Sequence, residues 1–184
     1  MGIRSIIRYT VSALAFAFAV LGVCLAAARA GGKRIKLPVG LMILAVAAVV
    51  DITGLRIGLK EWRYLEGEIR PVPLETTLSE LRLGWWPFLY HTAGNLLWFF
   101  PIGVLWKALS PKHSMLSALL VGAGLSLSVE CLQYLLGTGI SDADDILLNA
   151  AGALAGAFAH SLFRKSAVRR QRGKPPSSPP SVGP

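Results

Sequence analysis

Residues 122–156 read GAGLSLSVECLQYLLGTGISDADDILLNAAGALAG, two apolar runs joined by a short acidic turn. The first run contains Glu130 and Gln133, and the second opens with Asn149. A carboxylate inside an apolar membrane span costs about 2.5–3.5 kcal/mol on insertion scales, so such a residue normally faces the protein interior and has a function. The stretch therefore predicts two neighbouring membrane helices whose polar side chains share an interior face.

The rest of the chain is also unusually apolar. Of its 184 residues, 53% are hydrophobic and only 16% are charged, which is too apolar for an ordinary soluble domain. A membrane helix needs about 20 mostly apolar residues, within a range of about 17–25. Five runs fit this range: residues 6–28, 37–55, 89–108, 115–136 and 146–163. The second is the weakest, because Asp51 lies near its end. We expect an all-α fold, a polytopic transmembrane helical bundle of about five spans.

The charge distribution indicates how the spans are oriented. The net charge of +9 comes from basic clusters that flank apolar runs, which is typical of contact with anionic lipid and argues against a nucleic-acid partner. The turn between the last two runs has three aspartates and no Lys or Arg, whereas six Lys and Arg residues follow Phe163. The positive-inside rule then predicts a multi-pass membrane protein with a cytoplasmic C-terminal tail and an acidic turn outside.

The long connection before the third run has features of its own. Apolar residues at Leu74, Leu78 and Leu81 have helical spacing and predict a short extracytoplasmic amphipathic helix. Four aromatic residues of this region are suited to the headgroup level of a bilayer: Trp62, Tyr64, Trp85 and Trp86.

We divide the chain into three parts. Residues 1–36 form the first span and its basic loop, and residues 37–165 form the main membrane domain. Residues 166–184 are basic and rich in Pro and Ser, so we expect a disordered tail.

Polar and small residues recur at helical spacing on both sides of the acidic turn. On the fourth run they are Gly122, Ser126, Glu130, Gln133 and Gly137, and on the fifth they are Asp145, Asn149, Gly152 and Gly156. Each set shares one helix face. The short turn makes the two helices antiparallel neighbours, and the glycines of the fifth run predict close approach of these two helices. We therefore expect a shared cavity between the last two helices, opening toward the aspartates.

His91 and Asn95 lie four residues apart on the third run and could form a third wall of this cavity. The predicted ligand-binding residues are His91, Asn95, Glu130, Gln133, Asp142, Asp144, Asp145 and Asn149. Glu130 and Asp145 are the candidates for a catalytic role. No cofactor motif, metal-ligand spacing or phosphate-binding glycine loop occurs, so we assign neither a cofactor nor a metal.

Each candidate also has a purely structural interpretation. Ser141 and Asp144 have the spacing of a helix capping box. Glu130 and Gln133 could join helices by hydrogen bonds, and Gly152 and Gly156 could serve packing alone. His91 could be a structural histidine. The two cysteines, inside apolar runs, are interpreted as packing residues.

Three motifs in order resemble the VanZ-like family of bacterial membrane proteins. They are Asn95-Leu-Leu-Trp-Phe99-Phe-Pro101-Ile-Gly103, then Glu130-Cys-Leu-Gln133, and then Asp142-Ala-Asp144-Asp145-Ile-Leu-Leu-Asn149-Ala-Ala-Gly152. The resemblance extends over about residues 71–163, within the 37–165 domain. This chain has Gly139 where the family often has an arginine, so it lacks that cation beside the acidic residues.

The resemblance implies a cell-envelope protein of the bacterial membrane, related to a protein linked to antibiotic resistance against teicoplanin. We expect a non-enzymatic protein whose outer-facing acidic pocket binds an amphiphile, either a glycopeptide antibiotic or a lipid-linked wall precursor, in contact with membrane lipid. One alternative is a membrane-embedded enzyme acting on a lipid-linked envelope substrate, with Glu130 as general base and the aspartates holding a cation. A proton-coupled carrier is a third possibility, which the absence of a visible inverted repeat disfavours.

Overall fold

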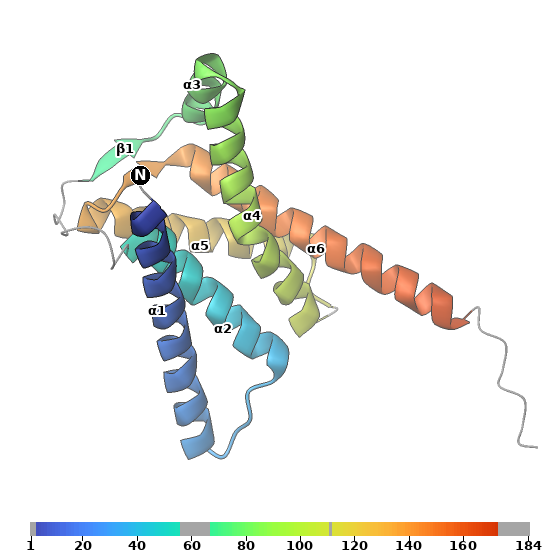
Figure 1. Cartoon of the computed structure of the whole chain (residues 1–184). Coiled ribbons are helices and arrows are strands. Elements are labelled where there is room, and N and C mark those ends of the chain that lie inside the picture. The colour runs from blue at the N-terminus through green and yellow to red at the C-terminus, as the bar shows by residue number, and fades with distance from the viewer. Residues whose placement is uncertain (1–2, 56–66, 111, 173–184) are drawn as a thin grey trace, which may run out of the picture.

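The computed structural model describes residues 3–55, 67–110 and 112–172, and these residues are almost entirely helical (Figure 1). Within the described residues the elements in chain order are α1 (Ile3–Ala30), α2 (Leu37–Val49), the π-helix η1 (Val50–Leu55), β1 (Glu68–Arg70), α3 (Glu75–Leu83), α4 (Trp85–Leu109), α5 (Met115–Leu136), β2 (Ile140–Asp142) and α6 (Ala143–Arg172). The all-α membrane fold is confirmed, and one short parallel pair, β1 with β2, adds to it.

Four helices, α1, α4, α5 and α6, are long and apolar enough to cross a membrane. The chain is therefore a membrane protein. The second expected span, residues 37–55, is helical throughout but differs from these four. Its α-helical part, α2, has only 13 residues and continues as the six-residue π-helix η1. Asp51 is fully buried within η1, and Thr53 Oγ1 donates a hydrogen bond to Val49 O at 2.6 Å.

The predicted amphipathic helix is confirmed as α3. Leu74, which precedes the first residue of α3, has a φ of 67°, in the left-handed region. Gly84, which follows its last residue, has a φ of 143°. Such angles are uncommon for residues other than glycine, so Leu74 needs support from its surroundings. Trp85 and Trp86 begin α4 and are exposed, while Trp62 and Tyr64 lie outside the described residues. Figure 1 shows α3 at one end of α4, beyond the main bundle.

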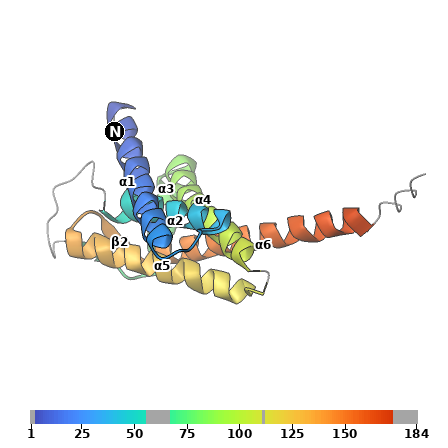
Figure 2. The same cartoon turned by 90° about the horizontal axis from the view of Figure 1, so that it is seen from below.

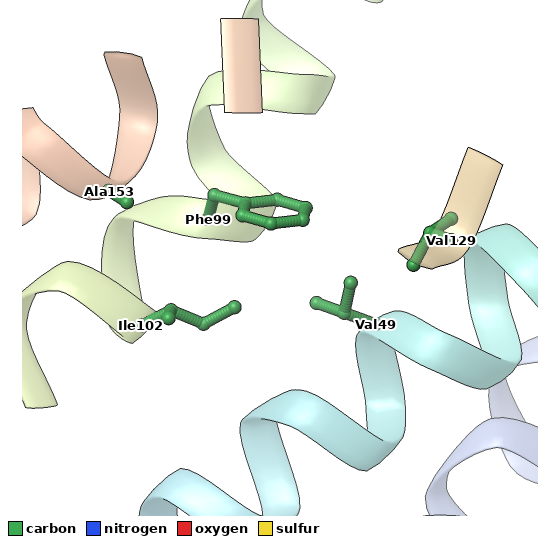
Figure 3. Packing of buried hydrophobic residues seen from close by; sticks show 5 residues of the cluster. All are labelled: Val49, Phe99, Ile102, Val129 and Ala153. Atoms are coloured by element: carbon green, nitrogen blue, oxygen red, sulfur yellow. The ribbon is translucent and has the colours of Figure 1, made fainter. Parts of the chain in front are cut away.

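The hydrophobic core lies where four helices meet. Val49 of α2, Phe99 and Ile102 of α4, Val129 of α5 and Ala153 of α6 are all buried there (Figure 3). Helix α1 packs against α2, and α5 packs against α6. In the view from below, α5 runs along the lower edge of the bundle and α6 extends away past α4 (Figure 2). The core therefore connects the motif-bearing helices to α2.

The glycines of α6 pack against α4, and this corrects the expectation that they bring α5 and α6 together. A Cβ on Gly152 would collide with the main-chain oxygen of Leu96, and one on Gly156 with that of Phe100. The contact between α5 and α6 instead depends on Gly122, where a Cβ would lie 2.6 Å from Ala153 Cβ. A helix in a bundle has two neighbours, and the sequence spacing does not say which of them a glycine faces.

The C-terminal helix is longer than expected. α6 runs through Arg172, so residues 166–172, expected as part of a disordered tail, are helical. Figure 1 shows the end of α6 projecting away from the other helices. Residues 173–184, the remainder of the expected tail, lie outside the described residues.

Candidate functional site

A cavity of about 690 Å³ lies between η1, α4, α5 and α6. Six polar side chains of the predicted site line it: His91, Asn95, Glu130, Gln133, Asp145 and Asn149. Tyr90 and Trp98 of α4 add aromatic surface, and Thr53 of η1 completes the wall. The structure thus brings together six of the eight predicted ligand-binding residues, whereas Asp142 and Asp144 do not line this cavity.

Asp145 connects α6 to α4. His91 Nε2 lies 2.6 Å from Asp145 Oδ1, and Asn95 Nδ2 donates a hydrogen bond to the same oxygen at 2.7 Å. Both contacts come from one face of α4, because residues four apart in a helix are neighbours on its surface. Charge-assisted hydrogen bonds of this kind are shorter and stronger than neutral ones. Asp145 is therefore held in a fixed position at the cavity wall.

Glu80 of α3 is a site residue that the sequence did not reveal. Its Oε2 lies 2.9 Å from His91 Nδ1, on the side of the ring opposite Asp145. The imidazole of His91 therefore lies between two carboxylates, with Asp145 near Nε2 and Glu80 near Nδ1. The one signal in the sequence was a charged residue among the leucines of the amphipathic helix, and that pattern is usual for a solvated face.

Two hydrogen bonds connect Glu130 to the acidic turn. Its Oε2 accepts a hydrogen bond from Asp142 N at 2.8 Å, and its main-chain oxygen accepts one from Ser141 Oγ at 2.7 Å. The side chain is buried, with 4% of the residue exposed. A buried carboxylate needs such partners, since an unpaired one would be costly in this environment.

Asp142 and Asp144 support helix α3 and the start of α6. Asp142 Oδ1 accepts from Asp144 N at 2.9 Å, as the N-cap residue of α6, and its Oδ2 accepts from Thr76 Oγ1. Asp144 accepts from Thr77 N at 2.7 Å and from Leu74 N, which stabilises the left-handed backbone of Leu74. The predicted capping box, with Ser141 as the cap, is wrong: Asp142 caps α6, and Asp144 caps the neighbouring helix α3.

Gln133 and Asn149 each join two elements. Gln133 Nε2 donates to Thr53 O of η1 at 2.7 Å, and Asn149 Nδ2 donates to Ser126 Oγ of α5 at 2.9 Å. The amide oxygens of both residues are buried and have no hydrogen-bond partner among the described residues. A Cβ at Gly139 would lie 3.1 Å from Gln133 Oε1, so a larger residue there would contact this amide.

Asp51 is a further buried carboxylate of the helical bundle, besides Glu130. It is a carboxylate in an apolar run, and it is fully buried in η1, next to the cavity residues Ile52 and Thr53. From the sequence we interpreted Asp51 only as a weakness of the second span. A carboxylate inside an apolar span is costly, and this cost made Glu130 a candidate site residue. The same argument makes Asp51 a candidate site residue as well.

A family model described as VanZ/LLP1 matches residues 41–164, about two thirds of the chain. The matched range includes η1, α3, α4, α5 and most of α6. Every residue that lines the cavity lies within it. No curated protein and no solved structure matches the chain.

Proposed function

This chain belongs to the VanZ/LLP1 family, and we propose that it is a cell-envelope protein whose cavity binds the polar part of an amphiphile. The bound molecule is a glycopeptide antibiotic of the teicoplanin kind or a lipid-linked wall precursor, and binding contributes to antibiotic tolerance. The observation that carries this proposal is the cavity itself, in which six polar side chains from three helices meet within an otherwise apolar bundle.

The size and chemistry of the cavity suit the polar part of such a ligand. Its volume of about 690 Å³ lies within the range of about 300–1,000 Å³ that is usual for small-molecule sites. The carboxylates of Glu130 and Asp145 and the amide oxygens of two neighbours provide hydrogen-bond acceptors. No Lys or Arg lines the cavity among the described residues. Ammonium and hydroxyl groups, which donate hydrogen bonds, are therefore the groups that this wall favours.

The proposed orientation puts the site on the outer side of the membrane. The acidic turn would be extracytoplasmic and the basic C-terminal segment cytoplasmic, following the positive-inside rule. In this orientation α3 lies at the outer interface, because its leucines and the adjacent Trp85 and Trp86 are exposed. A ligand arriving from outside, or within the outer leaflet, would then meet the cavity without crossing the membrane.

Binding to the purified full-length protein in lipid nanodiscs tests the proposal. Fluorescent teicoplanin is the first probe, and a lipid-linked wall precursor is the competitor. We expect saturable binding that Asp145→Asn weakens, whereas Glu75→Gln, an exposed carboxylate of α3, leaves it unchanged. Binding that is equal in all three proteins, or absent for both probes, would contradict the proposed function.

A second candidate function is supported by one specific contact. His91 lies between Glu80 and Asp145 at the cavity wall, an arrangement typical of a residue that transfers protons. The enzyme alternative, acting on a lipid-linked envelope substrate, therefore gives His91 the role of general acid. The carboxylate of Glu130, the other candidate, accepts a hydrogen bond from Asp142 N. The aspartates of the turn are poor candidates for holding a cation, because their carboxylate oxygens already accept hydrogen bonds.

The two candidates differ in what happens to the lipid-linked substrate. An enzyme converts the precursor to a product that mass spectrometry of lipid extracts detects, and His91→Gln abolishes the conversion. A binding protein leaves the precursor intact. Lipid extracts and teicoplanin sensitivity of the same deletion strain, complemented with each variant, separate these outcomes in one experiment.

A further inference from the structure

A second hollow lies on a different face of α5 from the polar cavity. It is an apolar groove of about 350 Å³ between β1, α5 and the first turns of α6. Leu127, Cys131 and Leu135 of α5 form one side, and Ile146 of α6 forms another. The three α5 residues follow i, i+4 and i+8, so they make a continuous strip along the helix. The proposed ligand site does not use this groove.

The groove has the length and direction of a hydrocarbon chain. From Leu135 to Leu127 the helix rises about 12 Å, at about 1.5 Å per residue. The strip begins near the end of α5, beside the short sheet, and runs toward the middle of the apolar span. Leu127 and Leu135 are 53% and 46% exposed, so the groove is open to the surrounding lipid along its length. An acyl chain is the apolar molecule that a membrane provides at this position.

A cation lies at the rim where the groove meets the sheet. Arg70, the last residue of β1, lines the groove and pairs with Asp142 in the strand register. Its Nε donates to Glu68 Oε1 at 3.1 Å, with both side chains largely exposed. An exposed pair of this kind contributes about 0–1 kcal/mol, so a phosphate can replace Glu68 as the partner. Arginine binds phosphate through two parallel hydrogen bonds, whereas Glu68 makes only the single contact to Nε.

The acidic groups near Arg70 do not prevent this. Asp142 accepts hydrogen bonds from Thr76 and Asp144, and Glu130 accepts one from Asp142 N. Both carboxylates are thereby directed into the protein, and both residues are buried. Glu68 is the exposed acid that a phosphate would displace.

We propose that this groove is a binding site for one membrane phospholipid, with an acyl chain along Leu127, Cys131 and Leu135 and the phosphate on Arg70. Glu130 lines both the groove and the polar cavity. The bound lipid therefore covers the face of α5 that adjoins Glu130. This proposal does not depend on what the polar cavity binds.

Photo-crosslinking of the full-length protein tests the site directly. The protein is reconstituted in nanodiscs that contain a phosphatidylglycerol with a diazirine in its acyl chain, and the adducts are mapped by mass spectrometry. We expect labelling at residues 127–135 several-fold above that at Leu116 and Leu120, which are exposed on the same helix outside the groove. Leu127→Trp should remove the excess, and the matched control Leu120→Trp should keep it.

The proposed contact between the phosphate and Arg70 is tested by comparing two variants and two probes. Arg70→Gln should reduce retention of the phospholipid about tenfold, the effect of losing a charge-assisted hydrogen bond of about 1.5 kcal/mol, while Arg82→Gln on α3 should not. A photoactivatable fatty alcohol, which lacks the phosphate, should label the groove less than the phospholipid. Equal labelling by both probes would overturn the assignment of the phosphate to Arg70.

The native cysteines provide a second measurement. Cys131 is exposed and Cys24, on α1, is partly buried. In a Cys24→Ser variant, bound phospholipid should slow the reaction of Cys131 with N-ethylmaleimide relative to delipidated protein. The reaction of Cys24 in a Cys131→Ser variant gives the reference. Uniform lipid adducts along all exposed faces of α5, or a Cys131 reaction rate that bound phospholipid does not change, would overturn the phospholipid site.

Discussion

His91 Nε2 lies 2.6 Å from Asp145 Oδ1, although 54 residues separate the two in the chain. The contact joins the first turns of α4 and α6 at the wall of the polar cavity, and Glu80 approaches the opposite nitrogen of the same ring. Three elements therefore depend on one imidazole. These contacts make His91 the centre of the candidate site.

Asp145→Asn should impair function without removing the protein from the membrane. The amide keeps an oxygen that can accept a hydrogen bond, but the negative charge beside His91 is lost. A hydrogen bond to a charged group contributes about 1.5–3 kcal/mol, so binding of the probe should weaken about 10- to 100-fold. Titration of fluorescent teicoplanin in nanodiscs measures this, and Glu75→Gln serves as the control.

Glu130→Gln separates charge from hydrogen bonding at the buried position of α5. The amide oxygen can still accept from Asp142 N, so the amount of folded protein should stay near that of the wild type. Tolerance to teicoplanin in a complemented deletion strain should nevertheless fall. If both this variant and Asp145→Asn keep full activity, the acids serve only as caps and interhelical hydrogen-bonding groups.

Gly152→Val should disrupt the packing of α6 against α4. A Cβ there would collide with the main-chain oxygen of Leu96, and backbone atoms cannot move away as a flexible side chain does. We expect a loss of thermal stability of the order of 1–3 kcal/mol or more, typical of overpacking. Gly124→Val on α5 is the matched control, because nothing lies within 4 Å of its Cβ position. Equal melting temperatures for the two variants in detergent would contradict the close packing of α4 and α6.

Asp144→Ala should release helix α3 without unfolding the bundle. The two carboxylate oxygens accept hydrogen bonds from Leu74 N and Thr77 N, and their loss leaves the start of α3 without a cap. Removing a cap costs about 0.5–2 kcal/mol. Hydrogen–deuterium exchange should therefore rise in α3 and stay unchanged in α5. Glu75→Ala, in the same helix, is the control, and unchanged exchange in the Asp144 variant would count against this anchoring role.

The orientation in the membrane can be tested by cysteine labelling. In a background without native cysteines, a cysteine at position 140 should react with an impermeant maleimide in intact cells, and a cysteine at position 178 should not. Ile140 is the appropriate site in the acidic turn because it is 38% exposed, whereas Thr138 is fully buried. The reverse labelling pattern would put the cavity on the cytoplasmic side and rule out an outer-facing site.

The sequence alone determined the class of fold and six of the polar residues that line the cavity. Apolar runs of sufficient length can satisfy their backbone hydrogen bonds in a membrane only as helices, so the helical class follows from composition, and four of the five expected spans are long apolar helices. Helical spacing then put Glu130 and Gln133 on one face of α5, and that face is buried. His91 and Asn95 were paired for the same reason, and both reach the cavity. The spacing of residues within one helix is a local property, so the order of residues alone determines which of them share a face.

Only the tertiary structure decided which helices and side chains meet. Gly152 and Gly156 face α4 instead of α5, Glu80 reaches His91 from a separate helix, and Asp144 caps α3 across 67 to 70 positions of the chain. The pairing of β1 with β2 likewise joins distant segments. Spacing along a helix states which residues share a face, but the neighbour of that face depends on how all the helices pack together. That packing is set by the shape of the whole bundle, which no single stretch of sequence contains.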